Sequence, residues 1–494
     1  MKLVEVLEGV AVQSPLPASV ASFEVDGLAF DSRKAAPGYL FFAFAGAKAD
    51  GRQFAMDALG KGAVAVVSES PAPEDFNGPW IQVEHGRKAL ATVSGNFYNH
   101  PDRRLKITGV TGTNGKTTTT YLIDSILLAA GLTTALVGTI EYRLAGRHLP
   151  SINTTPESLE LFQLFAELEQ AGGKHVTMET SSHALSLGRV YGVQFETAVF
   201  TNLTRDHLDF HGDMDSYFAA KQLLFTSEAA RAPRFAVINH DDKYAGKIRT
   251  KSETEVITYG LGEGASARAQ RVATGFDGLR FEIHYGGRAY PVESPLVGEI
   301  NVYNLLAAWC AAYSLGIDTE IIARGIASCG AVPGRFERVS EGQPFLVIVD
   351  YAHTDDALRN AITIARGLTS SRVLTVFGCG GDRDRSKRPL MGMAAAELSD
   401  LVVLTSDNPR SEDPLSIMND AMVGIGRFDT GCIVEPDRER AIQKALEEAG
   451  PDDVVLIAGK GHETYQTLKD KTVPFDDREV ARRILRGFGY GKQT

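Results

Sequence analysis

The stretch LKITGVTGTNGKTTTTYLIDSILLAA, residues 105–130, decides the fold of this 494-residue chain. The apolar run at residues 105–110 predicts a buried strand, and residues 118–130 predict a helix. Between them lies the glycine-rich segment TGTNGKT, residues 111–117. A strand, a glycine-rich turn and a helix in this order are typical of a loop that binds phosphate groups.

The chemistry of this loop depends on its glycines, its lysine and its threonine. Glycines let backbone N–H groups approach phosphate oxygens, and Lys116 adds a positive charge at the helix N-terminus. Thr117 is placed to ligate Mg²⁺. Because Val110 occupies the first glycine position of the pattern GxxxxGKS/T, a tight turn that happens to contain lysine is the alternative. We expect a nucleoside triphosphate to contact Gly112, Thr113, Asn114, Gly115, Lys116, Thr117 and Thr118.

Composition and charge exclude several classes of protein. With 51 Lys and Arg against 62 Asp and Glu, the net charge is −11, and we expect no nucleic-acid partner. The cysteines form no CxxC pair, which argues against a zinc ribbon or a disulfide framework and fits a reducing compartment. Polar residues interrupt the longest apolar candidate, residues 121–140, so we expect no membrane span and a cytoplasmic location. The four cysteines are Cys310, Cys329, Cys379 and Cys432.

The chain length predicts about three domains, all of the α/β class. We place them at residues 1–97, 98–332 and 333–494. Strands are expected at residues 39–44, 63–67, 176–179 and 198–202, and a helix at residues 216–225. The last domain shows apolar runs at residues 345–349, 373–377, 401–405, 432–434 and 454–458, separated by helix-like segments. This alternation predicts βαβ crossovers and a mostly parallel, Rossmann-like sheet.

Four of these last strands are followed by polar clusters. The clusters are DYAH at residues 350–353, GGDR at 380–383, DNPR at 407–410 and GKGHE at 459–463. In parallel sheets, ligands bind beyond the carboxyl ends of the strands. The sequence therefore predicts a second binding region at one edge of the last sheet.

At this point the sequence resembles the Mur ligases, the ATP-dependent amide-forming enzymes of peptidoglycan precursor synthesis. The resemblance covers nearly the whole chain. It is carried by DSR (31–33), Gly38, LFF (40–42), DG (50–51), TGTNGKT (111–117), NTTP (153–156), METSSH (178–183), NLTRDHLD (202–209) and DNPR (407–410). The middle motifs are similar to the member that adds the third peptide residue, and DNPR resembles the form that adds meso-diaminopimelate.

The resemblance implies a fold and a reaction. The fold would comprise a UDP-binding N-terminal domain, a central P-loop ATPase domain and a C-terminal Rossmann-like domain. ATP would phosphorylate the glutamate side chain of UDP-N-acetylmuramoyl-L-alanyl-D-glutamate, and the amine of meso-2,6-diaminopimelate would attack the acyl phosphate. UDP-MurNAc-tripeptide, ADP and phosphate would be released, with two Mg²⁺ ions as cofactors. We expect a monomer.

The same resemblance assigns catalytic and metal-binding residues. Lys116, Glu179, His207 and Lys221 would be catalytic, and Thr117, Glu179, His207 and Lys221 would bind Mg²⁺. Lys221 would carry a carbamate formed from CO₂, which turns a cation into a metal-binding anion. Without the resemblance, Glu179 reads as a capping carboxylate, His207 as a structural histidine and Lys221 as a solvated lysine.

The remaining contacts implied by the resemblance fall into three groups. ATP would also contact Asn304, favoured over Asn301, together with Arg335 and Asp350. The UDP-sugar-peptide would contact Phe30, Ser32, Ala47, Lys48, Ala49, Asn153, Thr154, Thr155, Ser181, Leu187 and Arg189, although Leu187 stands where a polar residue is expected. Diaminopimelate would contact Arg383, Asp407, Asn408, Pro409, Arg410, Gly459 and Glu463.

Several alternatives remain open from the residues alone. The same ligase could add L-lysine, and DNPR could be a plain Asn-Pro turn with a solvated arginine. Folylpolyglutamate synthetase shares the loop, but the DSR and DNPR motifs weigh against it. The run GCGGDR at residues 378–383 could suggest an NAD(P)-dependent oxidoreductase, except that Arg383 replaces the last glycine of GxGxxG. A P-loop protein that only hydrolyses nucleotide would leave the polar strand ends unexplained.

Overall fold

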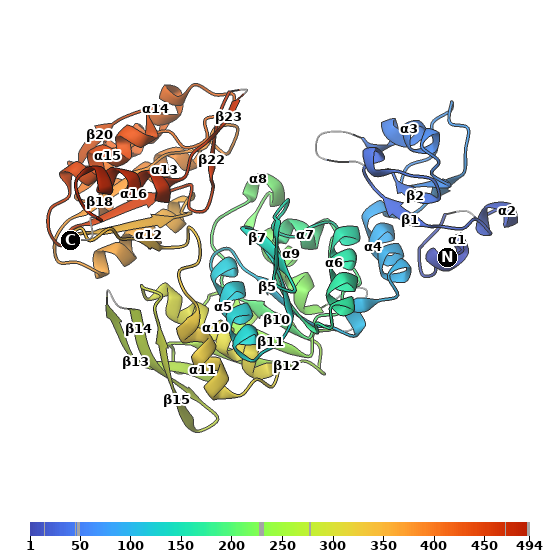
Figure 1. Ribbon diagram of the computed structural model, residues 1–494, viewed down its shortest axis with the longest axis horizontal. Helices are drawn as coiled ribbons and strands as arrows, with labels where there is room; N and C mark the ends of the chain where they lie inside the picture. The colour runs from blue at the N-terminus through green and yellow to red at the C-terminus, as the bar shows by residue number, and fades with distance from the viewer. Residues whose placement is uncertain are drawn as a thin grey trace.

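The computed structural model describes residues 1–13, 15–44, 46, 50–226, 232–275, 278–469 and 471–491. Three α/β units follow one another along the chain, and each contains its own large sheet (Figure 1). The predicted α/β class and its mostly parallel sheets are confirmed. Each sheet lies inside one predicted segment, while the boundaries at residues 97/98 and 332/333 stay predictions. Over the described ranges, the longest apolar helices fall short of what crossing a bilayer needs.

The N-terminal unit contains four parallel strands in sequence order. The first predicted strand is two residues too long, because the Phe44 carbonyl accepts a hydrogen bond from Gly51 N at 3.1 Å in the following loop. The strands are β1 (Gly27–Ala29), β2 (Tyr39–Phe42), β3 (Ala65–Ser68) and β4 (Trp80–Gln82). The helices are α1 (Leu3–Val6), α2 (Ala18–Ala21), α3 (Ala55–Gly60) and α4 (Gly86–Phe97).

The central unit is built on an eleven-stranded sheet of order β15-β14-β13-β12-β11-β10-β5-β9-β6-β7-β8. Its middle is parallel, and antiparallel strands that were not predicted extend both edges. The strands are β5 (Lys106–Thr111), β6 (Thr134–Val137), β7 (Glu141–Leu144), β8 (Arg147–Pro150), β9 (His175–Glu179), β10 (Thr197–Phe200), β11 (Phe235–Asn239), β12 (Glu255–Gly260), β13 (Ala267–Gly275), β14 (Gly278–Tyr285) and β15 (Arg288–Ser294).

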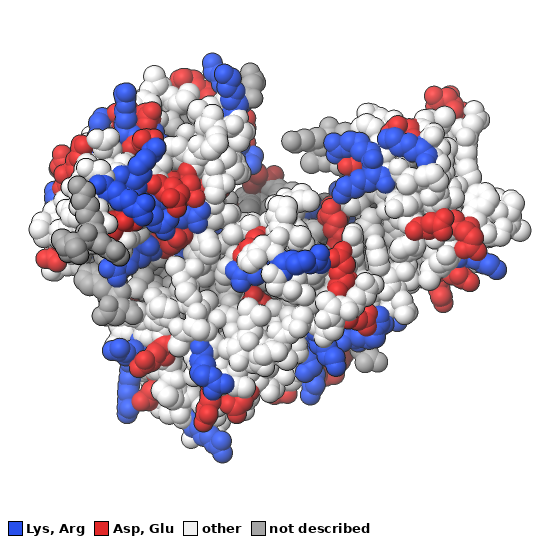
Figure 2. Space-filling view, viewed as in Figure 1, with Lys and Arg blue, Asp and Glu red and all other residues white. Residues whose placement is uncertain are grey.

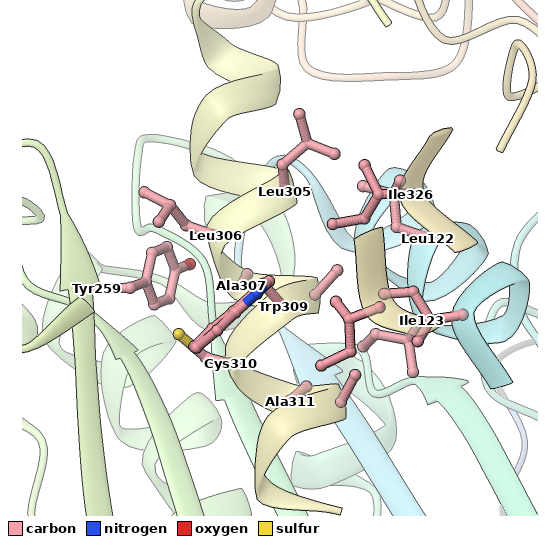
Figure 3. Close-up of a cluster of buried hydrophobic side chains, with 14 of the residues drawn as sticks. Leu122, Ile123, Tyr259, Leu305, Leu306, Ala307, Trp309, Cys310, Ala311 and Ile326 are labelled. Carbon is pink, nitrogen blue, oxygen red and sulfur yellow. The ribbon is translucent and has the colours of Figure 1, made fainter. Parts of the chain in front are cut away.

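Helix α5 follows the phosphate loop and packs with α10 and α11 against this sheet. It begins at Lys116, two residues earlier than predicted, because Gly115 adopts a left-handed N-cap conformation there. Trp309 is 1% exposed and packs against Tyr285 and Tyr290 of the sheet, in the buried cluster that also contains Tyr259 and Ile123 of α5 (Figure 3). The helices of the unit are α5 (Lys116–Ala129), α6 (Ser158–Gln170), α7 (Ser182–Ser186), α8 (Leu208–His211), α9 (Met214–Thr226), α10 (Ile300–Ser314) and α11 (Thr319–Ser328).

The C-terminal unit has a six-stranded sheet of order β16-β17-β21-β18-β19-β20, parallel except for β16. Two of its strands, β18 and β21, have the predicted bounds. Because β17, β21, β18 and β19 are neighbours and run the same way, the four predicted polar clusters meet at one edge. The strands are β16 (Glu337–Val339), β17 (Leu346–Asp350), β18 (Val373–Phe377), β19 (Leu401–Leu404), β20 (Gly431–Val434) and β21 (Val454–Ala458).

Helices cover this sheet, and a small antiparallel pair of strands lies beside its ligand-facing edge. The helices are α12 (Asp355–Gly367), α13 (Lys387–Leu398), α14 (Pro414–Ile425), α15 (Arg438–Glu448) and α16 (Asp477–Gly487). The strand pair is β22 (Tyr465–Leu468) and β23 (Lys471–Pro474). A bridge between Arg410 and Leu468 attaches β22 to the DNPR segment and fixes that loop to the hairpin.

Candidate active site

Backbone conformation and crowding admit only glycine at two positions of the phosphate loop. Gly112 has φ +151° and Gly115 has φ +86°, values that L side chains rarely adopt. A Cβ atom on Gly112 would lie 1.8 Å from Oγ1 of Thr201, and one on Gly115 would lie 2.4 Å from Oδ1 of Asn304. The loop therefore keeps its backbone bare where β5 ends and α5 begins, as close contact with phosphate oxygens requires.

Two lysines converge on this loop. Lys116 Nζ donates to the carbonyl oxygens of Gly112 at 3.0 Å and Thr113 at 2.9 Å, and Lys221 Nζ, from α9, donates to the same Gly112 oxygen at 2.8 Å. Lys221 is 2% exposed, so the solvated-lysine alternative is wrong. Burial, followed by the nearby Lys116 charge, holds the pKa of Lys221 well below its ordinary value and favours the neutral amine.

Glu179 and His207 come from two other segments, the end of β9 and the residue before α8. Glu179 ends β9, is buried, and accepts hydrogen bonds from the Thr139 backbone N–H at 2.8 Å and hydroxyl at 3.0 Å. His207 has a left-handed backbone, φ +53°, and its Nε2 lies 3.3 Å from the Asp206 carboxylate. Burial lowers the pKa of His207 to about 4, so its imidazole is neutral at pH 7 and has a lone pair for a metal ion.

An arginine connects the phosphate loop to the C-terminal unit. Arg335 Nη2 donates to Oγ1 of Thr117 at 3.1 Å, and its guanidinium stacks 4.5 Å from the centre of the Tyr351 ring. Asp350, at the end of β17, accepts a hydrogen bond from Phe336 N at 2.7 Å. Burial raises the pKa of Asp350, an effect that the Arg335 charge opposes. Arg335 therefore contacts the loop directly, and Asp350 lines the same cavity as the loop.

One cavity of about 780 Å³ joins the central and C-terminal units at this point. The space-filling view shows the surface deeply hollowed above the central unit, between the two outer units (Figure 2). Tyr303 and Asn301 also line the cavity, and Asn301 Oδ1 accepts from Asn304 Nδ2 at 2.9 Å. The predicted residues that line it are Gly112, Thr113, Asn114, Gly115, Lys116, Thr117, Thr118, Asn153, Thr154, Thr155, Glu179, Ser181, Leu187, Arg189, His207, Lys221, Asn304, Arg335 and Asp350.

The part of this cavity that was predicted to contact the peptide is hydrogen-bonded and partly apolar. Thr155 Oγ1 donates to the Glu179 carbonyl at 2.8 Å, and Arg189 donates to the Thr155 carbonyl at 3.0 Å and to Glu157 Oε1 at 2.9 Å. Leu187 lines the cavity at the position where a polar residue was expected. A polar contact to substrate from this side chain is therefore absent.

The predicted nucleotide-sugar contacts in the N-terminal unit lie apart from this cavity. Phe30 stacks near Phe44 with ring centres 6.3 Å apart, and the Ser32 carbonyl accepts from Lys61 Nζ at 2.9 Å. Neither residue lines the cavity. Ala47, Lys48 and Ala49 lie outside the described residues.

The residues predicted to bind the incoming amino acid form a second cluster at the edge of the C-terminal sheet. Arg410 is partly buried, has φ +52°, and donates from Nη1 to the Gly381 carbonyl at 2.7 Å. The solvated-arginine alternative is therefore wrong. Arg383 is exposed and donates to its neighbour, the Asp382 carbonyl, at 3.1 Å. The other members, Asp407, Asn408, Pro409, Gly459 and Glu463, come from the ends of β19 and β21.

Sequence reasoning missed several charged residues that bind these parts together. Lys387, at the start of α13, forms an ion pair with Asp206 at 2.8 Å and so links the C-terminal unit to the neighbour of His207. Arg388 and Arg438 are each 1% exposed, although arginines on helices are usually solvated. No local pattern marks these residues, because their charged partners lie 24 or more positions away in the chain.

Comparisons with known proteins bear on this geometry. Three family descriptions match the chain: the Mur ligase family catalytic domain at residues 24–98, the Mur ligase middle domain at 110–312 and the Mur ligase glutamate ligase domain at 334–461. A protein of Solibacter usitatus, named UDP-N-acetylmuramoyl-L-alanyl-D-glutamate–2,6-diaminopimelate ligase, is 63% identical over 490 residues, which is 99% of either chain. The chain belongs to the Mur ligase family.

Solved structures agree with this membership. A structure of a UDP-N-acetylmuramoyl-L-alanyl-D-glutamate–2,6-diaminopimelate ligase has a TM-score of 0.70 and 33% identity, covering 99% of this chain and all of the other. A folylpolyglutamate synthase of Mycobacterium tuberculosis, complexed with ADP and AMPPCP, shares only the fold, with 17% identity, a TM-score of 0.62 and coverage of 82% of this chain and 96% of its own. The predicted resemblance and three-unit ligase fold are confirmed, and the oxidoreductase and nucleotide-hydrolysing alternatives are wrong.

As a Mur ligase, the protein is an ATP-dependent enzyme that forms amide bonds. Mg²⁺ fits the oxygen ligands at the loop, the Glu179 carboxylate and the Thr117 hydroxyl, with the neutral His207 imidazole lining the same cavity. Among the described residues, no three His, Cys, Asp or Glu side chains gather as a ready-made metal site. Phosphate oxygens of the nucleotide would therefore have to complete the coordination, as is usual for Mg²⁺.

Proposed function

We propose that this Mur ligase joins meso-2,6-diaminopimelate to UDP-N-acetylmuramoyl-L-alanyl-D-glutamate, with ATP as co-substrate. The convergence of Lys116, Lys221, Glu179 and His207 on one interdomain cavity carries the proposal. The names of its relatives support the identity of both substrates. The products would be UDP-MurNAc-tripeptide, ADP and phosphate.

A carboxylate is a poor electrophile, so the ligase must activate it before an amine can attack. Phosphorylation of the glutamate side chain by ATP gives an acyl phosphate, and the amine then displaces phosphate. The protein supplies position and charge for these steps, without an enzyme nucleophile. Lys116 would leave its two loop carbonyls and neutralise the transferring phosphoryl group, and Arg335 would approach the same phosphates from the other unit.

We further propose that two Mg²⁺ ions act here, one held by Thr117 and Glu179 and one by His207 and Lys221. Mg²⁺ would neutralise charge that develops on the phosphate oxygens. Lys221 would first react with CO₂ to give a carbamate and a proton. Its burial supports this role, because a lowered pKa supplies the neutral amine that attacks CO₂.

The arginine of DNPR gives the proposal its amino-acid specificity. A guanidinium fork matches a carboxylate through two parallel hydrogen bonds, and the distal carboxylate is what distinguishes diaminopimelate from lysine. Arg410 is held for this task, since its backbone N–H donates to the Thr467 carbonyl at 3.1 Å and its carbonyl accepts from Lys469 N at 2.8 Å. These two bonds retain a left-handed backbone that a non-glycine residue rarely adopts.

The experiment is phosphate release by the purified protein with UDP-N-acetylmuramoyl-L-alanyl-D-glutamate, ATP and a panel of amino acids. We expect release that depends on both the dipeptide substrate and an amino acid, with meso-diaminopimelate the best. Omitting the amino acid is the matched control. Equal release without any amino acid, or release with L-glutamate on a folate acceptor instead, would contradict the proposal.

A further inference from the structure

Lys460 is a fully buried lysine at the centre of the amino-acid cluster. Its ammonium donates to Asn408 Oδ1 at 3.1 Å and to Glu463 Oε2 at 3.0 Å, and it lies 3.6 Å from Asp407 Oδ1. Asn408 Nδ2 donates to the same Glu463 oxygen at 2.8 Å. Lysine, asparagine and glutamate thus form a closed triangle that joins the ends of β19 and β21 across 55 residues of chain.

The charges around this triangle do not cancel. Arg438, directly beneath, is neutralised by Asp477, with which it shares two hydrogen bonds of 2.8 and 2.7 Å. Lys460 is then the cation that faces both Asp407 and Glu463. One positive charge against two carboxylates leaves one negative charge in excess.

Two carboxylate oxygens at this place accept no hydrogen bond from the described residues. Asp407 Oδ1 is buried and makes no hydrogen bond with any residue that the structure describes. None of the described residues donates to Glu463 Oε1 either, since the triangle uses Oε2 alone. An unsatisfied buried carboxylate oxygen is costly, and an ammonium group from a ligand would satisfy it.

We propose that Lys460 is a positioning residue that orients Glu463 and Asn408 and leaves the group Asp407, Lys460 and Glu463 with one excess negative charge, beside the positive Arg410 of the same site. This inference rests on the proposed function, in which the cluster binds the incoming amino acid. The excess negative charge matches the distal ammonium of the amino acid, and the positive charge of Arg410 matches the distal carboxylate. Arg410 lies close to the Gly380 backbone, where its Nη1 would be 3.1 Å from an added Cβ atom. The site is thereby complementary to a zwitterion.

The inference predicts how specificity depends on charge. The distal end of diaminopimelate is a zwitterion with no net charge, whereas the distal end of lysine carries one positive charge. Removing the Lys460 charge leaves two uncompensated carboxylates, which attract the lysine end more than the diaminopimelate end. Removing the Asp407 charge has the opposite effect, because Lys460 and Glu463 then cancel.

The first experiment measures KM and kcat of Lys460→Met for both amino acids and for ATP. We expect the KM for meso-diaminopimelate to rise about 10- to 100-fold, because a buried hydrogen-bonded charge is lost. The KM for ATP stays within about twofold, as its site is separate. The ratio of kcat/KM for diaminopimelate to that for L-lysine falls. Lys444→Met, which breaks a 2.6 Å pair with Glu435 in the same unit, is the control and leaves the ratio unchanged.

A second variant keeps the test valid if Lys460→Met fails to fold. Asp407→Asn retains the lysine, and we expect it to weaken use of L-lysine more than use of diaminopimelate. The double variant Asp407→Asn/Lys460→Met restores the original excess of one negative charge. Its ratio of kcat/KM for diaminopimelate to that for L-lysine should therefore return part of the way to the wild-type value. Loss that is equal for both amino acids in all three variants would show a purely structural lysine and overturn the inference. Failure of the wild-type protein to use either amino acid would instead overturn the proposed function.

Discussion

The two halves of the site are built in different ways. The phosphate half is a loop of the backbone, in which Gly112 and Gly115 have no room for side chains and Lys116 bonds the carbonyls of its own loop. The amino-acid half is a network of side chains, in which Asn408 and Glu463 meet from strands far apart in the chain. The difference predicts that single charges in the phosphate half control the rate of chemistry, whereas those in the amino-acid half control the choice of substrate.

The largest effect is expected from Lys116→Ala. Removing the cation nearest to the transferring phosphoryl group should lower kcat by about 10³-fold, since even one neutral oxyanion donor is worth roughly 10²–10³. Single-turnover formation of ADP measures the loss, and circular dichroism checks the fold. The exposed Lys174, on the segment before β9, serves as control in Lys174→Ala. Turnover like that of the wild type in Lys116→Ala would refute the loop assignment.

Lys221→Ala sharpens the same half. We expect kcat to fall by about 10²–10³-fold, because a carbamate there would supply a metal-binding charge. Acetate should restore part of the activity by replacing the missing carboxylate, and stripping CO₂ should lower the activity of the wild type. A fully active variant, or full activity in CO₂-free buffer with no response to added bicarbonate, would argue against the carbamate.

Arg410→Ala probes the other half. Losing a charge-assisted hydrogen bond to the distal carboxylate should cost about 1.5–3 kcal/mol, or roughly 10- to 100-fold in kcat/KM for meso-diaminopimelate. The KM for ATP should stay as in the wild type, which distinguishes this variant from Lys116→Ala. Arg359→Ala, which breaks a surface pair between Arg359 of α12 and Glu397 of α13, is the matched control. If Arg410→Ala weakened the use of ATP as much as the use of meso-diaminopimelate, the distinction between the two halves of the site would be lost.

The smallest effect concerns the sheet beneath the phosphate loop. Burial lowers the pKa of His175, in β9, from 6.5 to about 4. The unfolded chain therefore binds the proton first as the pH falls, and stability is lost between pH 6.5 and about 4, by at most about 1.4 kcal/mol per pH unit. In His175→Gln, the free energy of unfolding should differ less between pH 7 and pH 5 than in the wild type, as measured by urea unfolding. An unchanged slope would contradict the shift.

The same contrast decides what could be predicted from the sequence. The phosphate loop is contiguous in the sequence, and the residue types at 111–117 indicate phosphate binding by themselves. The loop, the strand before it and the helix after it could therefore be predicted together. The apolar runs of β18 and β21 are bounded by polar residues and gave correct bounds. The predicted start of α5 was two residues late, because the left-handed Gly115 admits a helix directly after it, and the strand predicted at residues 39–44 was two residues too long.

Contacts between distant segments could not be predicted. Lys387 and Asp206 are 181 positions apart, and nothing in either neighbourhood indicates the other. Lys460 lies in the polar run GKGHE, which was predicted to border a binding region, and its complete burial could not be predicted because it depends on β22, whose Tyr465 ring centre lies 5.6 Å from Lys460 Nζ. The antiparallel edges of the central sheet likewise depend on hairpin pairing that no motif marks.

The measurement that tests the account most directly is the kcat/KM of the wild-type protein for meso-diaminopimelate against that for L-lysine. With lysine bound, the Arg410 guanidinium would lose its carboxylate partner in a partly buried site. Leaving such a charge unpaired costs about 3–5 kcal/mol, or roughly 10²–10⁴ in discrimination. We predict a preference for meso-diaminopimelate of this size. Similar values for the two amino acids, or a preference for lysine, would contradict the account.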